Sequence, residues 1–254
     1  MKVVVLASGS EGNSTYIETK NTKLLIDIGR NAKYIKEKLE NIGVNASDIN
    51  YIIISHTHKD HTSALKTFVN RYKTTVLLSQ PMFLELEEIK DYDNIIIYED
   101  DIYLKDVKIK TIKSSHDAPD ARNFIIEYKN HSVAYVTDTG YINRKYFEIL
   151  KDKEIYLFES NHDIEMLLNG PYPKWLKTRV VGSYGHLSNK DAAFYLTKLI
   201  GPHTKKVILM HLSHINNTKE KAMEMMEETF KEYDIHFNNI ACANREEITE
   251  VVSW

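Results

Sequence analysis

Residues Ile52 to His61 read IIISHTHKDH, and this stretch decides the predicted fold and the predicted chemistry. The apolar run from Tyr51 to Ile54 predicts a buried strand that ends at Ser55. Imidazole and carboxylate side chains follow at once, and these are donors that suit zinc, manganese or iron. A polar helix start whose histidines face water is the alternative, but so many ligand-type residues behind one buried strand favour a metal site. The candidate ligands are His56, His58, Asp60 and His61.

A ligand-type residue just past an apolar run recurs further along the chain. His116 follows a predicted strand at 107–112, Asp138 follows one at 132–136, and His211 follows one at 207–210. Predicted helices alternate with the strands, which favours a layered α/β architecture. Asn189 predicts an N-cap, and short final strands are predicted near residue 235 and at 249–252. The predicted helices span residues 32–42, 64–69, 81–89, 190–200 and 219–231.

Composition limits the possible classes of protein. The chain has 254 residues, 43% hydrophobic and 27% charged, with a net charge of −3, so we expect one globular domain over residues 1–254. Cys242 is the only cysteine, which excludes an internal disulfide and a thiolate zinc cluster. The apolar run from Val3 to Ala7 is too short for a signal sequence or a membrane span. We expect a cytoplasmic protein, and the composition alone does not indicate nucleic-acid binding.

The order and spacing of these residues resemble the metallo-β-lactamase superfamily, whose HxHxDH motif is intact at residues 56–61. The resemblance implies an α/β fold of the αβ/βα four-layer sandwich type, with two mixed sheets face to face and helices outside. It also implies two divalent metal ions, zinc or manganese first and iron as a further possibility. Two divalent ions that lie close enough to share a bridging hydroxide suit hydrolysis, because they can hold both the attacking and the leaving oxygen. The implied ligands are His56, His58 and His116 for the first metal, Asp60, His61 and His211 for the second, and Asp138 as the bridge.

Within the superfamily the chain resembles the YycJ family, also called VicX or WalJ. Four stretches carry this resemblance, at residues 8–14, 114–120, 159–189 and 209–217. It implies a metal-dependent DNA exonuclease that acts 5′ to 3′ on duplex DNA, is linked to DNA repair and uses a hydroxide held between the metals. Asp60 would then orient the hydroxide, and His186 in the sequence GHLS would stabilise or protonate the leaving oxygen. The alternative for His186 is a helix cap.

Two segments are candidates for substrate binding. The loop Ser8 to Ser14, which includes Gly9 and Asn13, could bind a terminal phosphate through backbone amides, although it could also be an ordinary hairpin. The segment 169–179 carries Lys174 and Arg179 among aromatic residues and could contact the DNA backbone. The alternative is an ordinary solvated loop with a buried tryptophan.

Other functions share the same metal chemistry. A small-molecule or cyclic nucleotide phosphodiesterase of this fold is the second hypothesis, because only the length of the substrate separates it from a nuclease. A thioester or lactone hydrolase of this fold is a weaker third hypothesis. From a different class, the chain could be a metal-loaded regulatory or binding protein with little turnover, although such a module would not need a proton donor like His186 beside the metals. The sequence does not specify the native metal or the oligomeric state.

Overall fold

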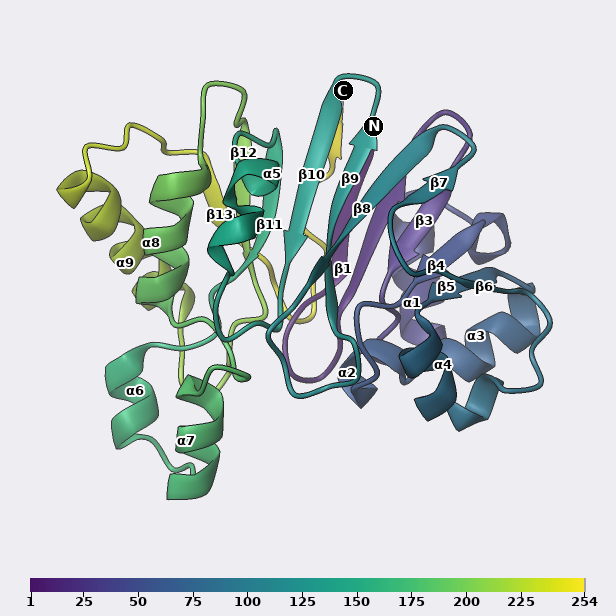
Figure 1. The fold of residues 1–254 in the computed structure, drawn as a ribbon, viewed down its shortest axis with the longest axis horizontal. Coiled ribbons are helices and arrows are strands. Elements are labelled where there is room, and N and C mark those ends of the chain that lie inside the picture. The colour runs from purple at the N-terminus through teal and green to yellow at the C-terminus, as the bar shows by residue number, and fades with distance from the viewer. Residues whose placement is uncertain (254) are drawn as a thin grey trace.

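The computed structural model describes residues 1–253 and consists of two mixed sheets packed face to face (Figure 1). The order of the first sheet is β14, β1, β2, β3, β4, β5, β6, and that of the second is β13, β12, β11, β10, β9, β8, β7. The strands of the first sheet are β1 (Lys2–Ala7), β2 (Ser14–Glu18), β3 (Lys23–Ile26), β4 (Tyr51–Ile53), β5 (Thr75–Leu78), β6 (Ile95–Ile97) and β14 (Val252–Ser253). Those of the second are β7 (Ile102–Leu104), β8 (Val107–Lys113), β9 (Arg122–Tyr128), β10 (His131–Val136), β11 (Ile155–Glu159), β12 (Lys206–Met210) and β13 (Ile240–Cys242).

Helices cover the outer face of each sheet, so the predicted four-layer α/β sandwich is confirmed. Ile35 of α1 and Phe68 of α3 pack on the first sheet, whereas Leu196 of α8 and Met226 of α9 pack on the second. The helices are α1 (Ala32–Asn41), α2 (Lys59–Thr62), α3 (Leu65–Tyr72), α4 (Gln80–Glu85), α5 (Phe147–Leu150), α6 (Ile164–Asn169), α7 (Lys174–Val181), α8 (Asn189–Leu199) and α9 (Lys219–Glu232), with short 3₁₀ turns at η1 (Ala46–Asp48), η2 (Glu87–Ile89) and η3 (Arg144–Tyr146).

The central strands are buried on both faces, which explains their nearly continuous apolar sequences. Side chains alternate between the faces of a strand. In β12, Ile208 and Met210 therefore point into the core between the sheets, while Val207 and Leu209 point to the helices outside. Strands covered on both sides cannot use the polar alternation of a half-exposed strand.

The carboxyl ends of the central strands meet at one edge of the sandwich. Strands β3, β4 and β5 run parallel in the first sheet, as do β10, β11 and β12 in the second. Asp27, Asp138 and His211 follow β3, β10 and β12 with left-handed φ angles of 59°, 53° and 57°. Such angles are uncommon for residues other than glycine and cluster at functional sites. The strand-end residues are thus collected where the chain turns sharply.

Two local predictions were wrong, and one of the alternatives is excluded. The final strand of the second sheet is β13 at Ile240–Cys242 and not near Ile235, because pairing with β12 sets the register from Val207 opposite Ile240. The segment after residue 173 is the helix α7, and Trp175 is 68% exposed rather than buried. Ser188 caps α8 instead of Asn189. Asn189 is buried, where its side chain bonds to Ser160 and Asn217.

In Figure 1 the helices α6 and α7 lie beyond the end of the second sheet, apart from α8 and α9.

None of the helices within residues 1–253 combines the length and the apolar character that crossing a bilayer requires.

Candidate metal centre and active site

The first set of candidate ligands, which we call the metal 1 group, consists of His56, His58 and His116. Their candidate ligand atoms all lie within 4.8 Å of one another. His56 and His58 lie in the extended chain between β4 and α2, and His116 follows β8. The sequence separates His116 from the other two by more than fifty residues, and the facing sheets bring them together.

The second set, the metal 2 group, consists of Asp60, His61 and His211, whose candidate ligand atoms also lie within 4.8 Å of one another. Asp60 and His61 belong to the short helix α2, and His211 follows β12. His61 Nε2 lies 3.4 Å from Asp60 Oδ2. Burial disfavours the imidazolium form of His61, but Asp60, Asp138 and Asp27 together raise its pKa well above the ordinary value. The carboxylates around this ring make a site that attracts a cation.

Asp138 lies between the two groups. Its Oδ1 atom is 3.9 Å from His116 Nε2 and 3.1 Å from His211 Nε2, and its Oδ2 atom is 3.3 Å from His61 Nε2. Burial opposes ionisation, yet the neighbouring histidines, His211 first, hold the pKa of Asp138 well below its ordinary value. A buried carboxylate is therefore positioned to face a cation in either group.

The buried histidines are oriented in the way that metal binding requires. In each ring Nδ1 faces a protein oxygen, and Nε2 of His61, His116 and His211 faces Asp138, which is the arrangement that a shared metal site requires. His56 Nε2 is buried without a hydrogen-bond partner, and burial lowers the pKa of His56 well below its ordinary value, which favours the neutral, ligating form. These residues fit divalent ions with nitrogen and oxygen ligands. The Nδ1 partners are Ser55 Oγ for His56 at 3.1 Å, Asp27 Oδ2 for His61 at 2.8 Å, the Gly185 carbonyl for His116 at 3.2 Å and Asn13 Oδ1 for His211 at 3.2 Å.

Asp27 is the main support of the metal 2 group, and our sequence analysis did not identify it. The carboxylate is fully buried. Besides His61, it accepts hydrogen bonds from the Ser55 backbone and hydroxyl, both at 2.7 Å, and from the Tyr135 hydroxyl at 3.0 Å. Its position directly after β3 was the available signal, because it repeats the strand-end pattern of the other candidates.

The predicted phosphate loop packs against the metal 2 group. The Ser8 hydroxyl accepts a hydrogen bond from the His211 backbone at 2.8 Å. Asn13 Nδ2 donates to Asp60 Oδ2 at 3.2 Å, and the Gly9 amide donates to Asn13 Oδ1 at 2.9 Å. The amides of Gly12 and Asn13 donate to the carbonyls of Gly9 and Asp60. Several amides that a bound phosphate would need are thus engaged within the protein.

His186 lies beside both groups, with its ring centroid 5.1 Å from that of His116 and 5.2 Å from that of His211. Its Nδ1 atom is 2.7 Å from Glu159 Oε1. Glu159 is fully buried at the end of β11, and it also accepts from the amides of Thr139 and Leu187. Burial disfavours the charged ring, but Glu159 raises the pKa of His186 to about 9. The pair can hold a proton beside the candidate metal ligands.

Lys174 and Arg179 belong to α7, next to the metal 1 group. Arg179 Nε donates to Asp117 Oδ2 at 2.6 Å, and Asp117 Oδ1 lies 3.5 Å from His116 Nε2. Residues 169–190 contain four basic residues and no acidic one, whereas the whole chain has 33 Lys and Arg against 36 Asp and Glu. This segment is locally basic in a chain that is acidic overall.

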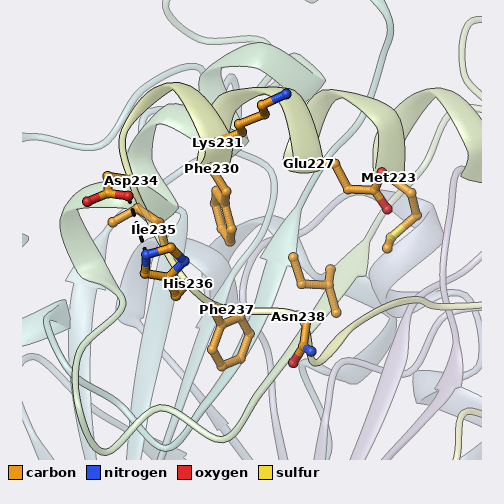
Figure 2. Close-up of a pocket in the computed structure, with 10 residues that line it drawn as sticks. Met223, Glu227, Phe230, Lys231, Asp234, Ile235, His236, Phe237 and Asn238 are labelled. Carbon is orange, nitrogen blue, oxygen red and sulfur yellow. Dashed lines mark ion pairs between the residues drawn. The ribbon is translucent and has the colours of Figure 1, made fainter.

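A cavity of about 540 Å³ lies between α9 and the chain that follows it, as Figure 2 shows. Phe230, Phe237 and Met223 contribute apolar walls, and the ion pair of Asp234 with His236 lies at one end. None of the predicted site residues lines this cavity. The candidate metal ligands and catalytic residues therefore lie at the edge of the sheets and not in the cavity beside α9.

Comparison with known proteins identifies the class. The model of the metallo-β-lactamase superfamily matches residues 7–211, and the chain belongs to this superfamily. Solved structures agree in fold. YhfI from Bacillus subtilis has a TM-score of 0.72 at 14% identity over 98% of both chains. The short form of human tRNase Z has a TM-score of 0.66 at 13% identity over the full length of both chains.

Two relatives show to which family within the superfamily the chain belongs. Exodeoxyribonuclease YycJ of Bacillus anthracis is 33% identical over 90% of this chain and 88% of its own length. Exodeoxyribonuclease WalJ of Streptococcus pneumoniae is 33% identical over 92% of this chain and 90% of its own. The protein is thus a metallo-hydrolase of the YycJ/WalJ family, as its sequence motifs predicted.

Proposed function

We propose that this protein is a metal-dependent exonuclease that degrades duplex DNA from the 5′ end and serves DNA repair. The observation that carries the proposal is the pair of ligand groups around Asp138, with the His186 and Glu159 pair beside them. The similarity to relatives named exodeoxyribonucleases supports DNA as the substrate. Both the metal groups and the proton-holding pair suit cleavage of a phosphodiester.

Two divalent ions, zinc or manganese, are the proposed cofactors. His56, His58 and His116 would hold the first, Asp60, His61 and His211 the second, and Asp138 both. When bound, such ions lower the pKa of water and neutralise the charge that develops on a phosphoryl group. The protein fixes where the ions lie, because Asp27, Asn13 and Ser55 hold the Nδ1 side of three ligand rings.

His186 is the proposed catalytic acid. A 3′ oxygen is a poor leaving group until it receives a proton, and a side chain that donates it accelerates the step. Glu159 holds the His186 ring through Nδ1 and favours its protonated form. Nε2 is thus left to face the departing oxygen. Asp60 of the metal 2 group, which also accepts a hydrogen bond from Asn13, would orient the attacking water.

The proposed DNA surface is α7 with the loop after it. Trp175 and Tyr184 are 68% and 66% exposed, and aromatic rings stack on unpaired bases. Lys174 and Arg179 contribute the charge that phosphates require. Arg179 links this surface to the metal 1 group through Asp117.

The nuclease assignment predicts release of nucleotides from one 5′ end of a duplex labelled at either end, with manganese or zinc added. Asp60→Ala and His186→Ala are each expected to lower the rate at least about a hundredfold, because one removes a metal ligand and the other the proton donor. His236→Ala is the matched control, since His236 is exposed and lines the 540 Å³ cavity beside α9, which contains none of the predicted site residues. Turnover of a small phosphodiester without any cleavage of DNA would overturn the assignment and indicate a small-molecule phosphodiesterase.

The α7 surface predicts a change in the salt dependence of DNA binding. Each phosphate contact contributes about 0.9 to the slope of log K against log salt concentration. Replacing Lys174 and Arg179 by alanine together should therefore make this negative slope shallower, by up to roughly 2. The control pair is Lys105 and Lys129, exposed residues in turns at the opposite ends of the strands. An unchanged slope in the α7 variant, measured by fluorescence anisotropy, would reject this surface.

A further inference from the structure

Strand β6 ends the first sheet with a sequence that is typical of an interior strand. All three of its residues, Ile95 to Ile97, are isoleucine, and no strand within residues 1–253 pairs with its outer edge. A continuous apolar run is typical of a strand that is covered on both faces, yet Ile96 and Ile97 are 42% and 39% exposed. Figure 1 shows this edge at the right of the molecule, apart from α6 and α7.

The backbone of β6 presents hydrogen-bonding groups on its open side. The Asn94 carbonyl accepts from the Val76 amide at 2.9 Å, and the Tyr98 amide donates to the Leu78 carbonyl at 3.1 Å. Residues with even numbers therefore face β5, and the amide and carbonyl of Ile97 point away from the sheet. Such groups are a template for a further strand, which edge strands usually block with a lysine, a proline or a bulge. Strand β6 contains no lysine or proline, and its register against β5 is regular.

Acidic residues flank β6 at both ends. Residues 85–101 contain eight acidic residues and one basic residue, whereas the whole chain has a net charge of only −3. The basic residue, Lys90, pairs with Glu87 at 2.9 Å. Asp93 before the strand and Glu99 after it are both exposed. Negative charge is thus concentrated on both sides of an apolar, open edge.

This charge determines which partner fits the edge. Two copies of β6 that pair antiparallel around Ile96 place Asp93 of each copy opposite Glu99 of the other, and like charges in directly opposite positions are destabilising. The same carboxylates repel nucleic acid. An extended polypeptide with an apolar centre and lysine or arginine at both ends is attracted in either strand direction.

We propose that the β6 edge binds a partner protein through an extended basic segment, which adds a strand to the first sheet. The main chain of β6 supplies the hydrogen bonds, Ile96 and Ile97 supply apolar contact, and the flanking carboxylates pair with the basic ends of the segment. The inference goes beyond the proposed exonuclease function. It gives the protein a docking edge that is separate from α7, so a partner and DNA can be held at the same time.

A synthetic peptide tests the proposal directly. The probe has five alternating valine and threonine residues between two lysines at each end, and its binding to the full chain is measured by fluorescence anisotropy. A second probe has the same sequence and charge, but methyl groups on its three central amide nitrogens remove donors from both of its edges. The methylated probe is expected to bind at least about tenfold more weakly, because main-chain hydrogen bonds hold an added strand. Equal affinities, or no binding of either probe, would overturn the proposal.

Ile97→Pro locates the binding site on the open side of β6. Proline lacks the amide donor, and an edge strand tolerates it where the amide faces away from the sheet. The variant is expected to bind the unmethylated probe at least about tenfold more weakly, with little change in its thermal unfolding midpoint. Ile97→Val is the matched control, because valine keeps the amide and a branched apolar side chain. Full affinity in a folded Ile97→Pro protein would place the peptide elsewhere and overturn the assignment.

Charge variants test the preference for a basic partner and leave the backbone of β6 intact. Asp93→Asn combined with Glu99→Gln is expected to weaken binding of the lysine probe at least about fivefold at low salt. The control combines Glu228→Gln with Glu232→Gln, which changes two exposed residues of α9. A probe with glutamates in place of its lysines should bind the wild type at least about tenfold more weakly. Unchanged affinity in the Asp93 and Glu99 variant, or equal binding of the lysine and glutamate probes, would contradict the proposal.

Discussion

Asp138→Asn is expected to lower kcat/KM for duplex DNA at least about a thousandfold and to reduce the number of divalent ions bound per chain. The substitution is nearly isosteric, so the hydrogen bond from the Thr137 hydroxyl to Oδ2, at 2.6 Å, can persist on the amide oxygen. The negative charge is lost where His61, His116 and His211 converge. Activity, metal content by mass spectrometry and the thermal unfolding midpoint should be measured together.

Asp91→Asn is the matched control for this prediction, because Asp91 is exposed and far in sequence from the strand ends that carry the site. It makes the same chemical change and should leave activity and metal content unaltered. An Asp138→Asn protein that keeps its full metal content and more than a tenth of its activity would contradict the bridging role.

The candidate ligands could be predicted from the sequence because two simple rules locate them. Buried strands give continuous apolar runs, and the carboxyl ends of parallel strands meet at one edge of a sheet. His56, His116 and His211 each stand just past such a run. The periodicity alone places them at strand ends, and the superfamily motif then groups them into two metal sites.

The supporting residues Asp27 and Glu159 also stand at strand ends, but the sequence does not give their partners, because these depend on contacts between distant segments. Glu159 meets His186 only because β11 ends beneath the loop before α8, 27 positions further along the chain. Asp27 reaches His61 across 34 positions. A buried carboxylate looks the same in the sequence whether it caps a helix or holds a ligand ring. Its partners emerge only from the packed structure.

The α7 segment shows how local signals can conflict. Pro171, Pro173 and the nearby aromatic residues predict an irregular loop, whereas Pro173 in fact stands at the N-cap of α7. Leu176 and Val180, spaced by four, turn inward, and Val180 is buried. Trp175 is left outside, so the aromatic residue that composition assigns to a core faces solvent.

The second large effect is expected from Glu159→Gln, which should lower kcat on duplex DNA roughly a hundredfold while metal content stays unchanged. The amide oxygen of glutamine can still accept from the backbone of Thr139 and Leu187, so the loop keeps its contacts. The negative charge opposite His186 Nδ1 is removed, and with it the stabilisation of the protonated ring. His186 then donates its proton less readily.

A substrate with a good leaving group distinguishes this role from a structural one. A nitrophenyl phosphodiester departs without protonation, so Glu159→Gln should slow its hydrolysis far less than that of DNA. Because Glu159 acts through His186, the double variant with His186→Ala should be no slower on DNA than His186→Ala alone. Equal losses on both substrates, or additive losses in the double variant, would instead mean that Glu159 supports the metal site as a whole and that His186 is not the acid.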